Sequence, residues 1–277
     1  MKLDFYNLPR ESQLFNRAVK VHVTGAGGFV GHALTLALRS AGHVEAGVDD
    51  CDAVVHLAAI AHRRATPEEL RRVNVELAVQ TAKAAAGAGA RFVFVSSIKV
   101  HGERGERALR EDSPIAPQDP YADSKARAEE ALRAVPGLRL AIVRPPLAYG
   151  PRVKANFFAL LRAIARGIPL PLAAVRNRRS MIYVGSLADA IVRLLHHEGT
   201  YLVSDGEPCS TPELCRRIGR ALGRPARLFP FPAGLLPAKL AGSLEVDDRL
   251  IRERLGWRPP YTMDEGLRAT AQWYRGL

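Results

Sequence analysis

The chain has 277 residues, 47% of them hydrophobic and 25% charged, which is the composition of an ordinary globular protein rather than a disordered or fibrous one. Its three cysteines (Cys51, Cys209 and Cys215) form no CxxC pair and no even set, which argues against a disulfide framework or a structural zinc site and fits a reducing compartment. The net charge of +12 would attract an acidic partner, but the arginines are spread along the chain without interleaved aromatic residues, so we expect a solvated basic surface and no nucleic-acid binding.

The start of the chain, residues 1–19, has no apolar core of the kind that a secretory signal needs. The longest apolar stretch, Leu228 to Ala241, is interrupted by three prolines and Lys239 and is too short to cross a bilayer. We therefore expect an N-terminal extension over 1–19, no membrane insertion and a cytoplasmic location.

Strands and helices alternate after this extension. Each predicted strand is apolar on both faces, and each is followed by a segment with helical periodicity, which is typical of a parallel, doubly wound α/β sheet of the Rossmann type. The segments are a strand at Lys20–Thr24, a helix at 29–40, a strand at Asp52–Ala59, a helix from Thr66 to about Gly87, a strand at Phe92–Ser96, a helix at Tyr121–Ala134 and a strand at Leu138–Arg144.

The second half of the chain contains prolines at frequent intervals, and we predict that it forms a smaller lobe. Helices are predicted at Asn156–Arg166, at Ser186–His197, from Thr211 and at Thr262–Tyr274. The predicted organisation is a dinucleotide-binding domain over 20–150, with 186–203 contributing to it, and a C-terminal substrate lobe over 151–277.

A glycine cluster lies directly between the first strand and the first helix. Gly25, Gly28 and Gly31 follow the pattern G-x-x-G-x-x-G. Glycine permits a tight turn and a close approach of the backbone to a pyrophosphate, and the helix N-terminus presents free N–H groups to the anion. In this context the cluster predicts dinucleotide binding, although the spacing differs from G-x-G-x-x-G.

Tyr121 and Lys125 lie four residues apart and therefore on one face of the predicted helix. A neighbouring ammonium favours the phenolate form of a tyrosine, so this pair can move a proton near neutral pH. Ser96 and Ser97 end the preceding strand, where a hydroxyl can bind a substrate oxygen. Histidines such as His56 and His101 have no metal-ligand spacing, so we expect no metal.

Several motifs occur together in a fixed order, and with them the chain resembles the extended short-chain dehydrogenase/reductase family of sugar-nucleotide epimerases, dehydratases and reductases. The motifs are T-G-A-G-G-F-V-G (24–31), H-L-A-A (56–59), V-N-V (73–75), F-V-S-S (94–97), P-Y-A-D-S-K (120–125), R-P-P-L-A-Y-G-P (144–151), N-R-R-S-M-I-Y-V (177–184) and L-G-W (255–257).

The resemblance implies a role for each matching position. Tyr121 is the acid/base, Lys125 holds the nicotinamide ribose and lowers the tyrosine pKa, and Ser97, or else Ser96, orients the substrate hydroxyl. The implied cofactor-binding positions are Gly25, Gly28, Phe29, Val30, Gly31, Ala58, Asn74, Tyr121, Lys125 and Pro146. The implied substrate-binding positions are Ser97, Asn156 and Arg179, where an arginine suits a bidentate phosphate contact.

The resemblance also implies an activity. The chain most resembles bacterial UDP-glucose 4-epimerase-like proteins and UDP-4-keto-sugar reductases. This resemblance implies an NAD(P)-dependent 4-epimerase or 4-keto-reductase that acts on a UDP-sugar in cell-surface polysaccharide synthesis. NAD is the expected cofactor, with NADP not excluded. Ile98 and Lys99 stand where a dehydratase usually carries an acid pair, which disfavours dehydration. Dimerisation through helices 70–87 and 121–134 is a further expectation.

One departure from the family pattern concerns the span from Ala41 to Asp52. The family places a strand, a helix and another strand here, and the first of these strands ends in an acid that binds the adenosine ribose. Only a dozen residues are present. The sheet should therefore be shortened, with a defective or rebuilt adenosine pocket, and a non-catalytic nucleotide-binding pseudoenzyme becomes the alternative function.

Two connections remain open for this span. In one, Val44–Asp50 is the second strand and Asp49 is the ribose acid, but two or three residues reach only ~7–11 Å, short of the return path along a strand. In the other, the first helix leads straight to the strand at Asp52, which requires a left-handed crossover of the kind seen in only about 2% of cases.

Overall fold

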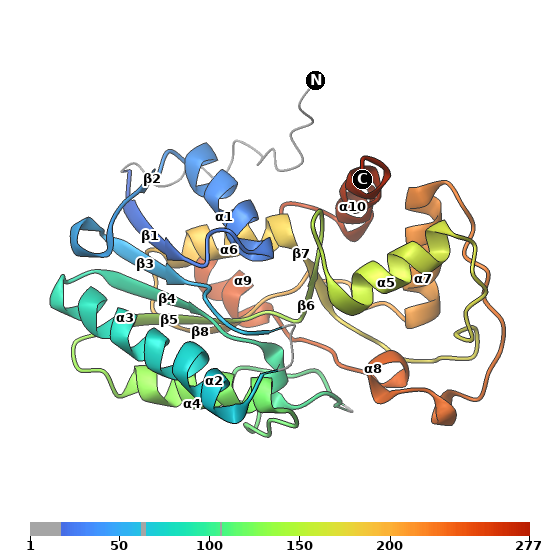
Figure 1. Cartoon of the computed structure of the whole chain (residues 1–277), viewed down its shortest axis with the longest axis horizontal. Coiled ribbons are helices and arrows are strands. Elements are labelled where there is room, and N and C mark those ends of the chain that lie inside the picture. The colour runs from blue at the N-terminus through green and yellow to red at the C-terminus, as the bar shows by residue number, and fades with distance from the viewer. Residues whose placement is uncertain (1–17, 62–64, 106) are drawn as a thin grey trace.

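The structure is a computed structural model that describes residues 18–61, 65–105 and 107–277 (Figure 1). The predicted N-terminal extension lies almost wholly outside the described residues. The strands are β1 (Lys20–Thr24), β2 (Val44–Glu45), β3 (Ala53–His56), β4 (Arg91–Val95), β5 (Arg139–Arg144), β6 (Leu147–Tyr149), β7 (Met181–Tyr183) and β8 (Gly199–Leu202). The helices are α1 (Phe29–Ser40), α2 (Pro67–Leu70), α3 (Leu77–Gly87), α4 (Pro120–Arg133), α5 (Ala155–Ala165), α6 (Val184–Leu194), α7 (Thr211–Leu222), α8 (Ala238–Ala241), α9 (Arg249–Leu255) and α10 (Met263–Arg275).

The main sheet is parallel throughout and has the order β2-β1-β3-β4-β5-β8. The predicted parallel α/β sheet is confirmed, and β8 joins it from the second half of the chain. Short strands β6 and β7 form a separate parallel pair. Neither was predicted from the sequence, because each is only three residues long, too short to show a hydrophobic alternation.

The two faces of the sheet are covered by different helices, as Figure 1 shows, with α1 and α6 on one side and α2, α3 and α4 on the other. Strand residues alternate between the two sides, because successive side chains point to opposite faces. Val93 and Val95 pack with the α1 and α6 cluster, whereas Phe92 and Phe94 pack with the alanines of α3 and α4. Each fully buried phenylalanine contributes about 1.5–3 kcal/mol.

The helix predicted from Thr66 begins and ends where expected but is not uniform. Thr66 and Glu69 form the predicted capping box, each side chain bonding the backbone N–H of the other. Between α2 and α3 the chain makes a π turn over Arg71–Glu76, a rare geometry that recurs at functional sites. This wider turn contains Asn74.

The span after α1 follows the first of the two connections, but with a much shorter second strand than Val44–Asp50. β2 exists, but it is only two residues long and pairs with the first two residues of β1. The chain then passes the amino end of β1, where Asp52 accepts a hydrogen bond from the Lys20 N–H and donates one to the Lys20 carbonyl. Because β2 is so short, the chain does not have to travel back along a full strand to reach the start of β3. The few residues between β2 and β3 are therefore long enough to connect them.

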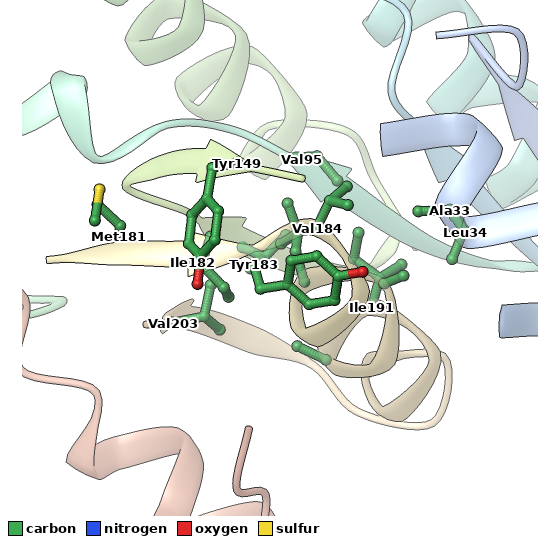
Figure 2. Close-up of a cluster of buried hydrophobic side chains, with 14 of the residues drawn as sticks. Ala33, Leu34, Val95, Tyr149, Met181, Ile182, Tyr183, Val184, Ile191 and Val203 are labelled. Carbon is green, nitrogen blue, oxygen red and sulfur yellow. The ribbon is translucent and has the colours of Figure 1, made fainter. Parts of the chain in front are cut away.

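The smaller lobe is tied to the main sheet at β6 and β7. Figure 2 shows Tyr149 and Tyr183 side by side above Val203, with Ile182, Val184 and Ile191 nearby. The two tyrosine rings are 5.8 Å apart, and both side chains are fully buried. Helices α5, α7 and α10 pack beyond this pair. Trp257 of the L-G-W motif is buried and donates to Asp189 of α6 at 2.8 Å.

Candidate active site

The glycine loop leaves the carboxyl end of β1 and leads into α1. Gly25 has a φ of +73°, which a glycine adopts without strain. A Cβ on Gly31 would lie 2.3 Å from the Gly25 carbonyl oxygen, so only glycine lets α1 approach the turn this closely. Residues 25–28 are exposed, and the α1 N-terminus has neither a side-chain cap nor an acidic residue in its first turn. The loop therefore fits a pyrophosphate.

The adenosine side of this loop is incomplete. Asp49 lies in the short 3₁₀ turn Val48–Asp50, and its neighbour Asp50 is paired with Lys20 at the amino end of β1. The glycine loop follows the opposite, carboxyl end of the strand. Asp49 is thus placed away from the position that the family pattern gives to a ribose-binding acid, and the predicted shortening of the sheet is confirmed at β2.

Asn74 and Ala58 lie between the glycine loop and α4. The Ala58 N–H donates to Thr24 Oγ1 at 3.2 Å, which fixes the strand end beside the loop. Asn74 is fully buried, accepts from the Ile60 N–H at 2.8 Å and donates to Ser124 Oγ at 2.8 Å. Its side chain therefore holds residues 58–60 against α4 rather than facing open space.

Tyr121, Lys125 and Ser97 are brought together at the carboxyl ends of β4 and β5. Asp119 caps α4 by accepting from the Ala122 N–H at 2.7 Å, which places Tyr121 in the first turn. The Lys125 ammonium donates to the Val95 carbonyl at 2.8 Å and lies 4.4 Å from the centre of the Phe94 ring. Ser97 begins the turn after β4, and its hydroxyl lowers the pKa of Tyr121.

Burial shifts the acidities of this pair in opposite directions. Loss of solvent raises the pKa of Tyr121 to about 12, with the Asp119 carboxylate adding to the effect and the Ser97 hydroxyl opposing it. Loss of solvent lowers the pKa of Lys125 to about 7, and the Glu129 carboxylate opposes that shift. Tyr121 is therefore protonated at neutral pH, ready to donate to a substrate oxygen.

The structure separates the roles of the two serines that the sequence left open. Ser96 is buried, and its hydroxyl donates to Glu129 Oε1 at 2.6 Å. The Ser97 hydroxyl acts on the pKa of Tyr121 and accepts from the Lys99 N–H at 3.2 Å. Ser97 is thus the serine available to a substrate, and Ser96 belongs to the support beneath it.

That support is a buried polar network which sequence reasoning missed. Glu129 and Arg144 are each 3% exposed and form a two-pronged ion pair, with N–O distances of 3.0 and 2.5 Å. Arg144 also contacts His101 Nε2 at 2.9 Å. His101 Nδ1 lies 3.0 Å from the Pro114 carbonyl, so the proton of the neutral ring belongs on Nδ1. The network joins α4 to the ends of β4 and β5.

The remaining predicted positions lie around this centre. Phe29 and Val30 are partly buried in the first turn of α1, and Pro146 is buried between β5 and β6. Asn156 is exposed in the first turn of α5. Arg179 is partly buried and donates to the Gly242 carbonyl at 2.9 Å. The Glu103 carboxylate is close enough to interact electrostatically with its guanidinium group. Arg179 therefore stands where the lobe faces the turn after β4.

Asn177, two residues earlier, was not singled out from the sequence. It is buried and bonds both the backbone and the side chain of Thr211, as well as the Leu240 carbonyl. The side chain holds the start of α7 against residues 240–242. This role becomes visible only when the fold brings Thr211 and residues 240–242 next to Asn177, so the sequence offered no signal for it.

Comparison with known proteins identifies the family. The profile of the NAD dependent epimerase/dehydratase family matches residues 44–203, a span that begins after the glycine loop. A UDP-glucose 4-epimerase from Vibrio cholerae is 41% identical over 248 residues, covering 79% of this chain and 75% of that protein. This chain belongs to the NAD-dependent epimerase/dehydratase family, whose members are extended short-chain dehydrogenases/reductases.

More distant relatives differ in what their names say they act on. A dTDP-glucose 4,6-dehydratase from Mycobacterium tuberculosis is 29% identical over 82% of this chain and 73% of that protein. Among solved structures, RMD from Pseudomonas aeruginosa in complex with NADPH superposes with a TM-score of 0.81 at 24% identity, covering 94% of this chain and 99% of that one. At this identity the superposition supports the Rossmann-like fold alone.

Two negative findings concern the described part of the chain. Among those residues, no group of three or more His, Cys, Asp or Glu side chains has the arrangement of a metal site. No described helix is both long and apolar enough to cross a bilayer.

Proposed function

We propose that this protein is a nucleotide-sugar 4-epimerase or 4-keto-reductase that acts on a UDP-sugar. The observation that carries the proposal is the placement of Tyr121, Lys125 and Ser97 at the strand ends that adjoin the glycine loop. The 41% identity to a UDP-glucose 4-epimerase supports the same substrate class. A bound nicotinamide dinucleotide would supply the hydride chemistry, and the glycine loop would hold its pyrophosphate.

The chain's own residues account for the proton transfer. Tyr121 donates its proton to the O4 position of a 4-keto sugar, while the Ser97 hydroxyl fixes that oxygen. The Lys125 amine, once protonated, favours the tyrosinate that remains. In the reverse direction the tyrosinate takes the proton of the sugar hydroxyl. Reduction uses the first direction only, and epimerisation uses both.

The residues after Ser97 support these reactions over dehydration. Ile98 is buried and offers no acid, and Lys99 is engaged by Asp119 and Glu103. A second acid/base pair beside the serine is therefore missing from this turn. The homodimer, the cytoplasmic location and the role in polysaccharide synthesis remain predictions, and light scattering on the purified protein tests the first.

The experiment is a Tyr121→Phe comparison. With UDP-glucose, UDP-galactose and their N-acetyl counterparts, the wild-type protein should interconvert C4 epimers without net nicotinamide consumption. A reductase would instead consume NADH or NADPH in proportion to a 4-keto-sugar. Removing the phenolic proton should lower kcat about 10²–10⁴-fold with little change in cofactor affinity. Equal turnover by both proteins would exclude Tyr121 as the acid/base.

The alternative is a nucleotide-binding pseudoenzyme, and the shortened sheet at β2 is the observation that favours it. Titration of the purified protein with NADH separates the two. Tight cofactor binding supports the enzyme, whereas no binding at millimolar NADH or NADPH would leave only the non-catalytic function.

A further inference from the structure

The basic charge of this protein is concentrated in the smaller lobe. Residues 151–188 and 214–244 contain thirteen Lys and Arg residues and no Asp or Glu, whereas the net charge of the whole chain is +12. The rest of the protein is therefore close to neutral. The arginines are spread along the chain as expected, but acidic residues are missing from these two segments, and an asymmetry of this kind indicates an acidic partner for one region.

Part of this charge gathers at the outer end of the lobe, where α5 and α7 end together. Arg224 donates to the Ala165 carbonyl at 2.9 Å and covers Gly167, so it joins the two helix ends. A shallow hollow beside this junction is lined by Arg216, Gly219, Arg220, Gly223, Arg224 and Ala226. Glu213 is the partner of three arginines of α7, so a single carboxylate faces several guanidinium groups.

Exposed apolar side chains lie next to these arginines. Residues 170 and 228 form a short β-bridge, and the Phe229 N–H donates to the Leu170 carbonyl at 3.0 Å. Ile168 lies two residues before this bridge and Phe229 one residue after it, and Phe231 follows two residues later between prolines. Ile168 is 46% exposed, Phe229 43% and Phe231 37%. We call this surface, Ile168, Phe229 and Phe231 with Arg216, Arg220, Arg224 and Arg227, the basic–apolar end.

The basic–apolar end is remote from the candidate active site. Asn156 is in the first turn of α5, and Arg166 follows its last turn. A helix of 11 residues is about 16 Å long. The drawing of the chain agrees, because α5 and the segments that follow α5 and α7 lie at the side of the molecule away from the main sheet (Figure 1). A diphosphate substrate at Tyr121 therefore leaves this charge unexplained.

We propose that the basic–apolar end docks the protein on the surface of an anionic lipid bilayer. Arginines bind lipid phosphates, and phenylalanine and isoleucine side chains gain free energy by entering the headgroup and acyl boundary. A second copy of this chain fits poorly, since a two-fold contact would bring like charges together. A nucleic acid would use the arginines but not the exposed aliphatic side chain.

The experiment is co-sedimentation of the full chain with vesicles. Wild-type protein should bind phosphatidylglycerol–phosphatidylcholine vesicles at low salt, and not vesicles of phosphatidylcholine alone. The charge variant Arg220→Glu/Arg227→Glu should bind at least tenfold more weakly, since each basic residue near such a surface contributes about fivefold. The apolar variant Phe229→Ser/Phe231→Ser should also lose binding, although its net charge is unchanged.

Matched controls keep this result specific. Arg72→Glu/Arg127→Glu alters the net charge equally, but on the exposed surface of the helices beside the main sheet, and should retain wild-type binding. Thermal unfolding checks that each variant is folded. The proposal is overturned if the wild-type protein does not bind anionic vesicles, or if the control pair loses as much binding as the charge variant. It is also overturned if the apolar variant binds normally and duplex DNA competes for the same arginines. None of these readouts depends on enzymatic activity.

Discussion

Glu129 is the residue on which the support of the active site depends. It lies one helical turn beyond Lys125 and is bonded at once by Ser96 and Arg144, all three of them buried. A buried ion pair contributes little net stability compared with an apolar pair, but breaking it leaves a charge without a partner. Its role is therefore to hold α4 in place against the ends of β4 and β5.

Replacing Glu129 by alanine should thus destabilise the protein by about 3–5 kcal/mol, because the Arg144 guanidinium stays buried without its carboxylate. Urea unfolding measures this change. Arg133→Ala is the matched control, since Arg133 reaches the same carboxylate at 3.4 Å from a half-exposed position and should cost less than about 1 kcal/mol. Similar small losses in both variants would contradict the role given to the pair.

The sequence predicted the reacting residues better than their support. Tyr121 and Lys125 are four apart on one helix, a spacing that is visible in one dimension. Glu129 looks the same in sequence as its exposed neighbour Glu130, and only the fold brings Arg144 to it. Ser96 and Ser97 could not be separated either, because which of two adjacent hydroxyls faces inward depends on how the strand ends.

At the scale of the element, the glycine loop is the feature that the sequence specified most closely. β1, the turn and α1 occupy the predicted positions, and the contacts of Gly31 explain why no other residue serves there. Gly27 offers a contrast within the same loop, since a Cβ at that position would meet nothing within 4 Å.

Gly31→Ala should therefore displace the turn, lower stability by about 1–3 kcal/mol and abolish NADH binding, because the added carbon would overlap the Gly25 carbonyl. Gly27→Ala should change the free energy of unfolding by less than about 0.5 kcal/mol. Thermal unfolding and NADH fluorescence titration measure both effects. Wild-type NADH affinity in Gly31→Ala would show that this loop does not hold the cofactor.

β2 is the element that the sequence could not specify. The first connection assumed a second strand of ordinary length and the other had no second strand, because a strand of two residues has no hydrophobic period to detect. Its shortness leaves Asp49 at the wrong end of β1 for a ribose contact. Asp49→Asn should accordingly change the dissociation constants for NAD and NADP less than about twofold, measured by calorimetry. A tenfold loss specific to NAD would place the ribose at Asp49 after all.

At the scale of the whole molecule, Asp205 connects the main sheet to the smaller lobe. It follows β8, accepts from the Tyr183 N–H of β7 at 2.9 Å and accepts from the Tyr149 hydroxyl of β6 at 2.7 Å. Burial raises the pKa of Asp205 to about 7, and the nearby Asp248 carboxylate adds to the shift. The folded protein thus keeps a proton that the unfolded chain, with a pKa near ~3.9, releases.

Because the folded state binds this extra proton, the contribution of Asp205 to stability should fall as pH rises from about 4 to about 7, and then stay constant. Asp205→Asn keeps a neutral group of the same shape. Its stability relative to wild type should therefore increase between pH 5 and pH 8, by at most about 4 kcal/mol. Urea unfolding at both pH values tests the sign, and a difference independent of pH would show that Asp205 is ionised throughout.

The short passage around the amino end of β1 also changes how the chain assembles. β1 and β3 meet through residues only 32 apart in sequence, with no further strand–helix–strand unit between them. The entropy lost on closing a loop grows with the logarithm of its length, so this central parallel pair forms at a lower entropic cost than it would in a longer sheet. The short connection between β1 and β3 therefore makes this part of the sheet quicker to nucleate.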